Sequence, residues 1–156
     1  MYNIILKATL LLIVLCVPSV LYSQSFADNL SCYADLTVSD EYSYQYQGDN
    51  AVDRYRETDW VAKGSRNKWI LLNWSYPIDI SFIKLFNRYT GDYDPIHSSE
   101  LILSDGSIFY VGPIKTHGRK LIDINKQGIL WVKYLIRSGV NNVGLSEILV
   151  FGDDTN

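Results

Sequence analysis

The chain has 156 residues, of which 47% are hydrophobic, 20% charged and 13% aromatic, and its formal net charge is −3. This composition is too apolar for a disordered chain, and the length suits a single domain. The acidic balance argues against a nucleic-acid binder, because such proteins cluster Lys and Arg on one face. The 12 Tyr and 4 Trp against a single Met favour strands over helices.

The N-terminus has the layout of a secretory signal peptide. Lys7 precedes an uncharged apolar run over residues 8–17, and small residues follow near Ser23 and Ser25. The run is shorter than the ~20 residues that a membrane span needs. We therefore expect a signal peptide over residues 1–23 and a secreted, extracellular protein, with an uncleaved signal anchor as the alternative. The mature chain would then comprise a loose leader at 24–30, one domain at 31–152 and a polar tail at 153–156.

The cysteines exclude a disulfide framework. Cys16 leaves with the signal peptide, so Cys32 remains as the one cysteine of the mature chain. A single cysteine can form neither an internal disulfide nor a cysteine-rich zinc site. We expect Cys32 to be a buried, unreactive thiol rather than a link to another chain. Two N-x-[ST] sequons, at Asn29 and Asn73, matter only in a eukaryotic source.

The apolar residues of the mature chain come in short runs bounded by turn residues. The expected strands cover residues 69–74, 80–86, 101–103, 108–111, 119–124, 131–137 and 143–151, with a turn at 75–77. The Asp-Gly pair at 105–106 predicts a β-hairpin. The run 80–86 is apolar on both parities with Lys84 as the exception, as for a strand buried on two faces, and 131–137 alternates cleanly.

About seven or eight short strands without helical periodicity predict an all-β protein, an antiparallel β-sandwich. The expected core residues are Trp60, Trp69, Leu85, Leu101, Val132 and Ile148.

The sequence contains no recognisable catalytic motif. Its two histidines, His97 and His117, are expected in loops, and no nucleophile elbow, zinc-protease motif, dinucleotide fingerprint or phosphate loop is present. A pair of catalytic carboxylates depends on spatial separation and stays open at this level. We expect a protein that is not an enzyme.

The densest polar segment is residues 50–60. Asp53, Glu57, Thr58 and Asp59 lie together in it, ahead of a tryptophan. Calcium takes six to eight oxygen ligands from carboxylates, hydroxyls and backbone carbonyls, which such a loop supplies. The equal alternative is a loop that caps its own amides with Asp53 and Thr58. An EF-hand pattern is absent, so a calcium site here would be of another type.

An ordered set of motifs resembles discoidin-like domains, also called coagulation factor V/VIII C-type domains. The run N-A-V-D-R-Y-R-E-T-D-W resembles their N-A-x-D-G-x-x-x-T-x-W signature, and W-I-L-L-N-W, I-K-L-F-N-R, L-S-D-G-S and N-V-G-L-S-E-I-L-V-F follow in the same order. The resemblance covers about residues 33–152. It implies the galactose-binding-like jelly-roll sandwich, which many carbohydrate-binding and adhesion domains share.

The resemblance also implies a structural calcium ion. The corresponding ligands here are Asp53, Thr58 and Glu147, with backbone oxygens near Asn50 and Tyr55. The departure is an arginine at position 54, where the family usually has glycine. If that position needs a positive φ, its backbone strain is of order 1 kcal/mol. Either the loop then differs, or the metal is absent.

The family's ligands bind in loops at one end of the sandwich. The corresponding candidates here are Arg88, Tyr89, Asp92, Tyr93, Asp94 and His97 in one loop and Asn141 and Asn142 in a second. Tyr89 or Tyr93 would supply the flat aromatic face that a sugar needs, and Arg88 with Asn141 the hydrogen bonds. The alternative is a purely structural loop in which Arg88 pairs with Asp92 or Asp94.

Together these features predict a secreted, non-catalytic recognition module that binds carbohydrate on a cell surface or matrix. We expect its partner to be a glycan or glycoprotein, and neither nucleic acid nor, after signal cleavage, a membrane. The alternative is a protein- or membrane-docking adhesion domain without sugar binding. Lipid docking is disfavoured, because the candidate loop tips at 89–97 and 138–142 carry neither apolar spikes nor basic residues.

Overall fold

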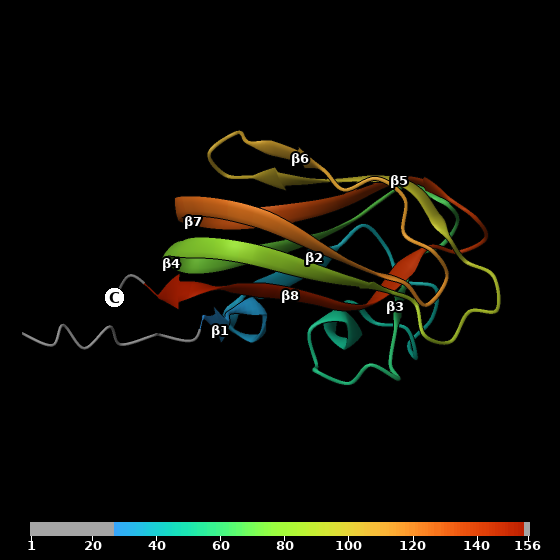
Figure 1. The fold of residues 1–156 in the computed structure, drawn as a ribbon. Helices are drawn as coiled ribbons and strands as arrows, with labels where there is room; N and C mark the ends of the chain where they lie inside the picture. Colours follow the sequence, from blue (N-terminus) through green and yellow to red (C-terminus); the bar gives the residue numbers. More distant parts are fainter. Residues whose placement is uncertain (1–26, 155–156) are drawn as a thin grey trace, which may run out of the picture.

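The computed structural model describes residues 27–154, so the expected signal peptide lies outside the described residues (Figure 1). Its elements are β1 (Asp28–Asn29), η1 (Ser31–Tyr33), β2 (Asp35–Val38), η2 (Gly48–Ala51), β3 (Trp60–Val61), β4 (Arg66–Asn87), β5 (Ile96–Leu103), β6 (Ile108–Tyr110), β7 (Arg119–Gly139) and β8 (Gly144–Asp154), where η1 and η2 are short 3₁₀ helices. Within the described residues no helix is long and apolar enough to cross a membrane.

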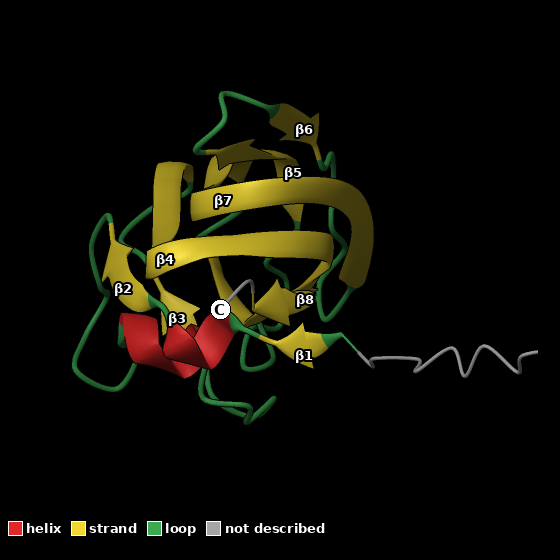
Figure 2. Ribbon diagram, turned by 90° about the vertical axis from the view of Figure 1, so that its left-hand side faces the viewer, coloured by secondary structure: helices red, strands yellow, loops and turns green. Residues whose placement is uncertain are grey.

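All paired strands are antiparallel, and two long strands connect the two layers of the molecule. Residues 66–73 of β4 pair with β2 and with the second half of β7, whereas residues 78–87 pair with the first half of β7 and with β8. The first layer therefore has the order β2–β4–β7–β5–β6, and the second has β7–β4–β8 with β1 and β3 along β8. Figure 2 shows β4 and β7 curving across the molecule. The predicted all-β, antiparallel sandwich is confirmed.

The turn predicted at 75–77 is a bend within one strand. The register between β4 and β7 shifts between Asn73 and Ile78, on either side of Pro77. Proline lacks the amide hydrogen that a sheet ladder needs, so it marks the point where regular pairing breaks. The bend lets a single strand of 22 residues take part in both layers.

The core between the layers contains the expected residues with one exception. Trp60, Leu85, Leu101, Val132 and Ile148 are each fully buried. Trp69 is only half-buried, because Ile70 and Leu72 take the core face of β4 at that point and turn its ring outward. The Lys133 ammonium lies 4.5 Å from the centroid of the Trp69 ring.

Three local expectations were wrong. Cys32 is exposed, because its neighbour Ser31 takes the inward position in η1 and accepts a hydrogen bond from the Val150 amide at 2.7 Å. His97 lies in β5 and not in a loop, since Ile96 already pairs with Ile114 and begins the strand there. The ends of the domain also lie further out than expected. Strand β1 lies in the segment expected to be a leader, and β8 continues into the expected tail.

Candidate functional site

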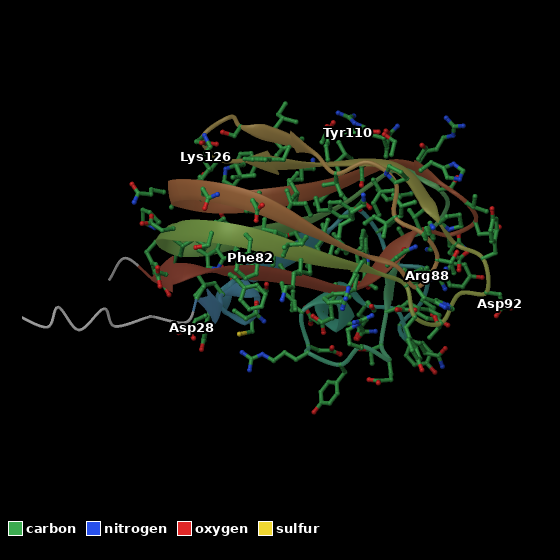
Figure 3. All side chains as sticks on the ribbon, viewed as in Figure 1. Asp28, Phe82, Arg88, Asp92, Tyr110 and Lys126 are labelled. Carbon is green, nitrogen blue, oxygen red and sulfur yellow. The ribbon has the colours of Figure 1, made fainter. Side chains whose placement is uncertain are left out.

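Three loops meet at one end of the sandwich, which we call the loop end: residues 88–95 between β4 and β5, 111–118 between β6 and β7, and 140–143 between β7 and β8. In Figure 3, Asp92 lies at the outer tip of this end and Arg88 lies nearer the body of the molecule. The loop end contains all the ligand residues expected from the sequence except His97, which is the second residue of β5.

A buried carboxylate holds the first of these loops in shape. Asp59 directly precedes β3 and is 1% exposed. Its carboxylate accepts hydrogen bonds from the Tyr89 amide at 2.8 Å, the Thr90 amide at 2.9 Å and the Thr90 hydroxyl. The sequence had placed Asp59 among the oxygens of the calcium loop, but in the structure it serves the loop end. Nothing in the local pattern reveals this role, because the partners are about 30 residues apart.

Arg88 braces the loop end from within. Its Nη1 donates to Asp94 Oδ2 at 3.0 Å and to the Asn142 carbonyl at 2.7 Å, and the side chain is only 11% exposed. Its Nε lies 3.8 Å from an Asp59 oxygen. Arg88 therefore pairs with Asp94, which is one of the two pairings predicted for a purely structural loop. The guanidinium joins loop 88–95 to loop 140–143.

The two asparagines strengthen the same junction. Asn141 Nδ2 donates to the Tyr93 carbonyl at 3.0 Å and to Asp94 Oδ1 at 3.2 Å. Asn142 Oδ1 accepts from the Gly64 amide at 2.7 Å. A Cβ at Gly91 would lie 1.5 Å from Asp94 Oδ2, so only glycine permits the close approach of Asp94. Asp94, Asn141 and Asn142 thus shape the site and hold its loops together.

The exposed residues of the loop end are those that can meet a ligand. Tyr89 and Tyr93 are 53% and 65% exposed, and Asp92 is exposed between them in sequence. His117 was not expected at the site. Its Nε2 donates to the Gly91 carbonyl at 2.7 Å, and its ring centroid lies 6.3 Å from that of Tyr89. Aromatic faces beside polar groups on a braced loop are suited to a polyol with an apolar ring face.

The expected metal loop caps itself. Asp53 Oδ1 accepts a hydrogen bond from the Tyr55 amide at 2.7 Å, and the Thr58 hydroxyl lies 2.8 Å from Asp53 Oδ2 and 2.7 Å from the Tyr55 carbonyl. Asn50 Nδ2 donates to the Gln45 and Asp59 carbonyls. These are the bonds that the self-capped alternative requires. The same bonds bring the Asp53 carboxylate, the Thr58 hydroxyl and the Tyr55 carbonyl close together at one side of the loop.

Glu147 on β8 completes this group. It is 1% exposed, and neither of its carboxylate oxygens makes a hydrogen bond of regular geometry within the described residues, although the Arg54 amide and the Asp53 carboxyl lie close to them. Burial and then the charge of Asp53 raise the pKa of the Glu147 carboxyl from 4.5 to about 8. Arg54 has a φ of 69°, so the position does need the conformation that glycine tolerates.

This donor set fits a hard cation. It consists of two neighbouring carboxylates, a hydroxyl and a backbone carbonyl, all of them oxygen. The described residues contain no group of three or more His, Cys, Asp or Glu side chains that could hold a metal. An ion here would therefore need ligands from the backbone or from water besides Asp53 and Glu147.

The sandwich topology defines the fold class, an antiparallel β-sandwich with the galactose-binding-like fold. Within that class, the chain belongs to the family described as a domain of unknown function (DUF7402), which it matches over residues 29–151. No curated protein sequence matches the chain.

Solved structures with the same fold include three glycan-binding proteins. A fucolectin from striped bass serum has a TM-score of 0.69 and 16% identity, over 83% of this chain and 48% of that chain. The family 32 CBM from C. perfringens NanJ, solved with galactose, has a TM-score of 0.66 and 17% identity, over 81% and 98%. A fucose-binding module from Streptococcus pneumoniae has a TM-score of 0.67 and 16% identity, over 81% and 99%. The chain spans about half the length of the fucolectin and nearly the whole of the two modules. Identities this low establish a shared fold.

Proposed function

We propose that the protein is a secreted, non-catalytic carbohydrate-binding module whose loop end takes a terminal sugar of a cell-surface or matrix glycan. The observation that carries the proposal is the pair of exposed tyrosines, Tyr89 and Tyr93, on a loop held by Asp59 and Arg88. The names of the structural neighbours, which include galactose and fucose complexes or modules, support a neutral sugar as the ligand class.

The braced loop favours binding for an energetic reason. A ligand that must order a loop loses binding free energy, whereas a loop already fixed by hydrogen bonds has less freedom to lose. In this proposal Tyr89 or Tyr93 stacks on the C–H face of the sugar, and Asp92, Asn141 and His117 exchange hydrogen bonds with its hydroxyls. Arg88 acts as a positioning residue, because Asp94 and Asn142 already occupy its guanidinium.

The test is a titration of the mature domain with galactose and fucose, followed by calorimetry and by NMR of the tyrosine rings. We expect millimolar to high-micromolar affinity for a monosaccharide, because few hydroxyl contacts must overcome solvent competition. Replacing the true stacking residue, by Tyr89→Ala or Tyr93→Ala, should abolish binding without unfolding the domain. Tyr110→Ala is the matched control, since Tyr110 is 73% exposed on β6 (Figure 3).

The opposite result would favour the docking alternative. If neither sugar perturbs Tyr89, Tyr93 or the Asn141 loop, and a protein ligand does perturb them, the domain is an adhesion module without sugar binding.

We also propose that Asp53, Thr58 and Glu147, with the Tyr55 carbonyl, hold a structural calcium ion. The support is the buried carboxylate of Glu147 beside a second carboxylate, since a divalent cation would neutralise both. A ligand that binds only the folded state adds about 2.7 kcal/mol at a hundredfold excess over Kd.

Chelator should therefore lower the melting temperature, and Glu147→Gln should remove that difference while the domain stays folded. Glu57→Gln is the control, because Glu57 lies exposed in the same loop. An unchanged melting temperature in chelator, with no metal in elemental analysis, would show that the loop is only self-capped.

A further inference from the structure

The outer face of the second layer carries a pattern that the loop-end site does not explain. In this layer residues 78–87 of β4 lie between β7 and β8, and Ile83 and Leu85 point into the core. The alternate positions therefore face outward. They form three cross-strand rows: Asp123–Phe82–Phe151, Leu121–Lys84–Leu149 and Arg119–Phe86–Glu147.

Two neighbouring cavities open on this face, on either side of Phe86. One, of about 410 Å³, is lined by Lys84, Phe86, Arg119, Lys120 and Leu121, with no acidic residue among them. The other, of about 550 Å³, is lined by Asp28, Asn29, Arg54, Arg56, Phe86, Glu147 and Leu149. Five basic residues thus line adjoining cavities on a chain whose net charge is −3.

The three basic residues of the first cavity are not neutralised by salt bridges within the described residues. Within residues 27–154, Lys68, Arg88, Lys126 and Arg137 each pair with a carboxylate, whereas Lys84, Arg119 and Lys120 do not. The unpaired cations of the first cavity, Lys84, Arg119 and Lys120, repel one another, and a bound anion would reduce that repulsion.

Aromatic rings hold two of the cations in place. Phe82 and Phe151 stack with their centroids 4.7 Å apart, and the Lys84 ammonium lies 5.5 and 5.0 Å from them. The Arg56 guanidinium lies 3.7 Å above the Phe86 ring. A cation that contacts a ring with one face can still donate hydrogen bonds from its other N–H groups. The face is therefore a rigid apolar strip with fixed positive charges.

We propose that this outer face is a second binding site, specific for an acidic polysaccharide that carries sulfate or carboxylate groups. An anionic group of the chain lies between Lys84 and Arg119, and the apolar face of its sugar ring lies over Leu121, which is 58% exposed. The site is separate from the loop end and stands without it.

Charge complementarity selects a narrow, chain-like ligand. Asp123 lies one cross-strand row beyond Lys84 and Leu121 on this face, and Asp28 and Glu147 line the adjoining cavity on the other side. A broad anionic surface such as a lipid bilayer would contact these acidic residues as well as the basic ones, and the acidic residues would repel it. A single saccharide chain can pass over the basic cavity and avoid them.

The test measures binding of the mature domain to heparin and to polygalacturonate, with dextran as the neutral chain. We expect both acidic chains to bind and dextran not to bind. Binding should weaken from about 0.05 M to about 0.5 M salt, because screening shortens the reach of exposed charges. Arg119→Gln should lower the affinity about fivefold and Lys84→Gln with Arg119→Gln more than about tenfold.

Matched controls make the result specific. Arg66→Gln and Lys63→Gln remove exposed cations elsewhere on the surface and should leave the affinity unchanged. Melting curves of each variant establish that it is folded. Tyr89→Ala and Tyr93→Ala should also leave this binding intact, so failure of the loop-end site and failure of this site are distinguishable.

Four outcomes would overturn the proposal. Equal losses in the Arg66 and Arg119 variants would mean that any surface cation suffices. Equal affinity for a single-stranded oligonucleotide would mean that the face selects charge and not a saccharide. Binding to vesicles of anionic lipid without binding to either polysaccharide would mean that the occupant is a membrane. Retention of neither acidic chain would leave the face without a glycan role.

Discussion

Arg54 shows how one residue stores strain in this fold. Its φ of 69° lies in the left-handed region, which costs a residue with a Cβ about 1 kcal/mol or more. Its side chain is exposed and donates to Cys32 Sγ at 2.9 Å. Residue 54 therefore has a backbone conformation that glycine tolerates, although it is an arginine.

Substitution at this position separates backbone strain from side-chain contact. Arg54→Gly and Arg54→Ala both remove the bond to Cys32, and glycine alone removes the strain. We expect Arg54→Gly to exceed Arg54→Ala in the free energy of unfolding by about 1 kcal/mol. Urea denaturation checks this difference. Equal stabilities would mean that the turn relaxes in the alanine variant.

Glu147 makes the stability of the metal-free domain depend on pH. Its pKa is raised to about 8 in the folded state from 4.5, so the folded state binds the proton more tightly than the unfolded state. The contribution of this carboxyl to the free energy of unfolding should be largest below pH 4.5 and should be lost as the pH rises to about 8.

Melting curves in chelator across this range test the prediction. Glu147→Gln, which cannot ionise, should remove the decline contributed by this position. Calcium in excess should remove it too, because a bound cation stabilises the ionised carboxylate. A decline that persists unchanged in Glu147→Gln would assign the pH dependence to another group.

At the scale of elements, the loop end depends on one buried acid. Asp59→Ala would leave the Tyr89 and Thr90 amides without their acceptor. An unsatisfied buried donor costs roughly 1–3 kcal/mol, so we expect a loss of about 3 kcal/mol in stability. The tyrosines would also lose their fixed position, and sugar affinity should fall.

Asp92→Ala is the control, since Asp92 is exposed on the same loop. It should change stability by less than about 0.5 kcal/mol. Chemical denaturation of the two variants measures the effect on stability, and sugar titration of Asp59→Ala measures the effect on affinity. A domain of unchanged stability after Asp59→Ala would show that the loop is held by Arg88 and Asn141 alone.

At the scale of the whole molecule, β4 and β7 tie the two layers into one cooperative unit. Each strand pairs in both layers, so neither layer can separate without breaking both strands. We expect a single unfolding transition, with tryptophan fluorescence and far-ultraviolet circular dichroism giving the same midpoint.

Leu85→Ala in the second layer and Leu101→Ala in the first should each cost about 2–5 kcal/mol and shift both probes together. A variant that shifts one probe and not the other would mean that the layers unfold separately.

Local sequence determined the strands and their faces. The alternation of Val132, Tyr134 and Ile136 and the Asp-Gly pair of the β5–β6 hairpin predict their structures correctly, because side-chain parity and turn chemistry act over a few residues. The ordered motifs also predicted the sandwich. The long strands β4 and β7 were each read as two, at 69–74 and 80–86 and at 119–124 and 131–137, since turn or polar residues inside a strand look like its end.

Tertiary structure alone decided the composition of the sites. Asp59 accepts hydrogen bonds from a loop about 30 residues away, and the His117 ring lies beside Tyr89. Arg119 on β7 lies opposite Phe86 on the neighbouring strand β4. Cys32 is exposed because a serine beside it took the inward position. None of these relations has a local signal. Each follows from which strands pair and in which register, and burial of the whole core selects that pairing.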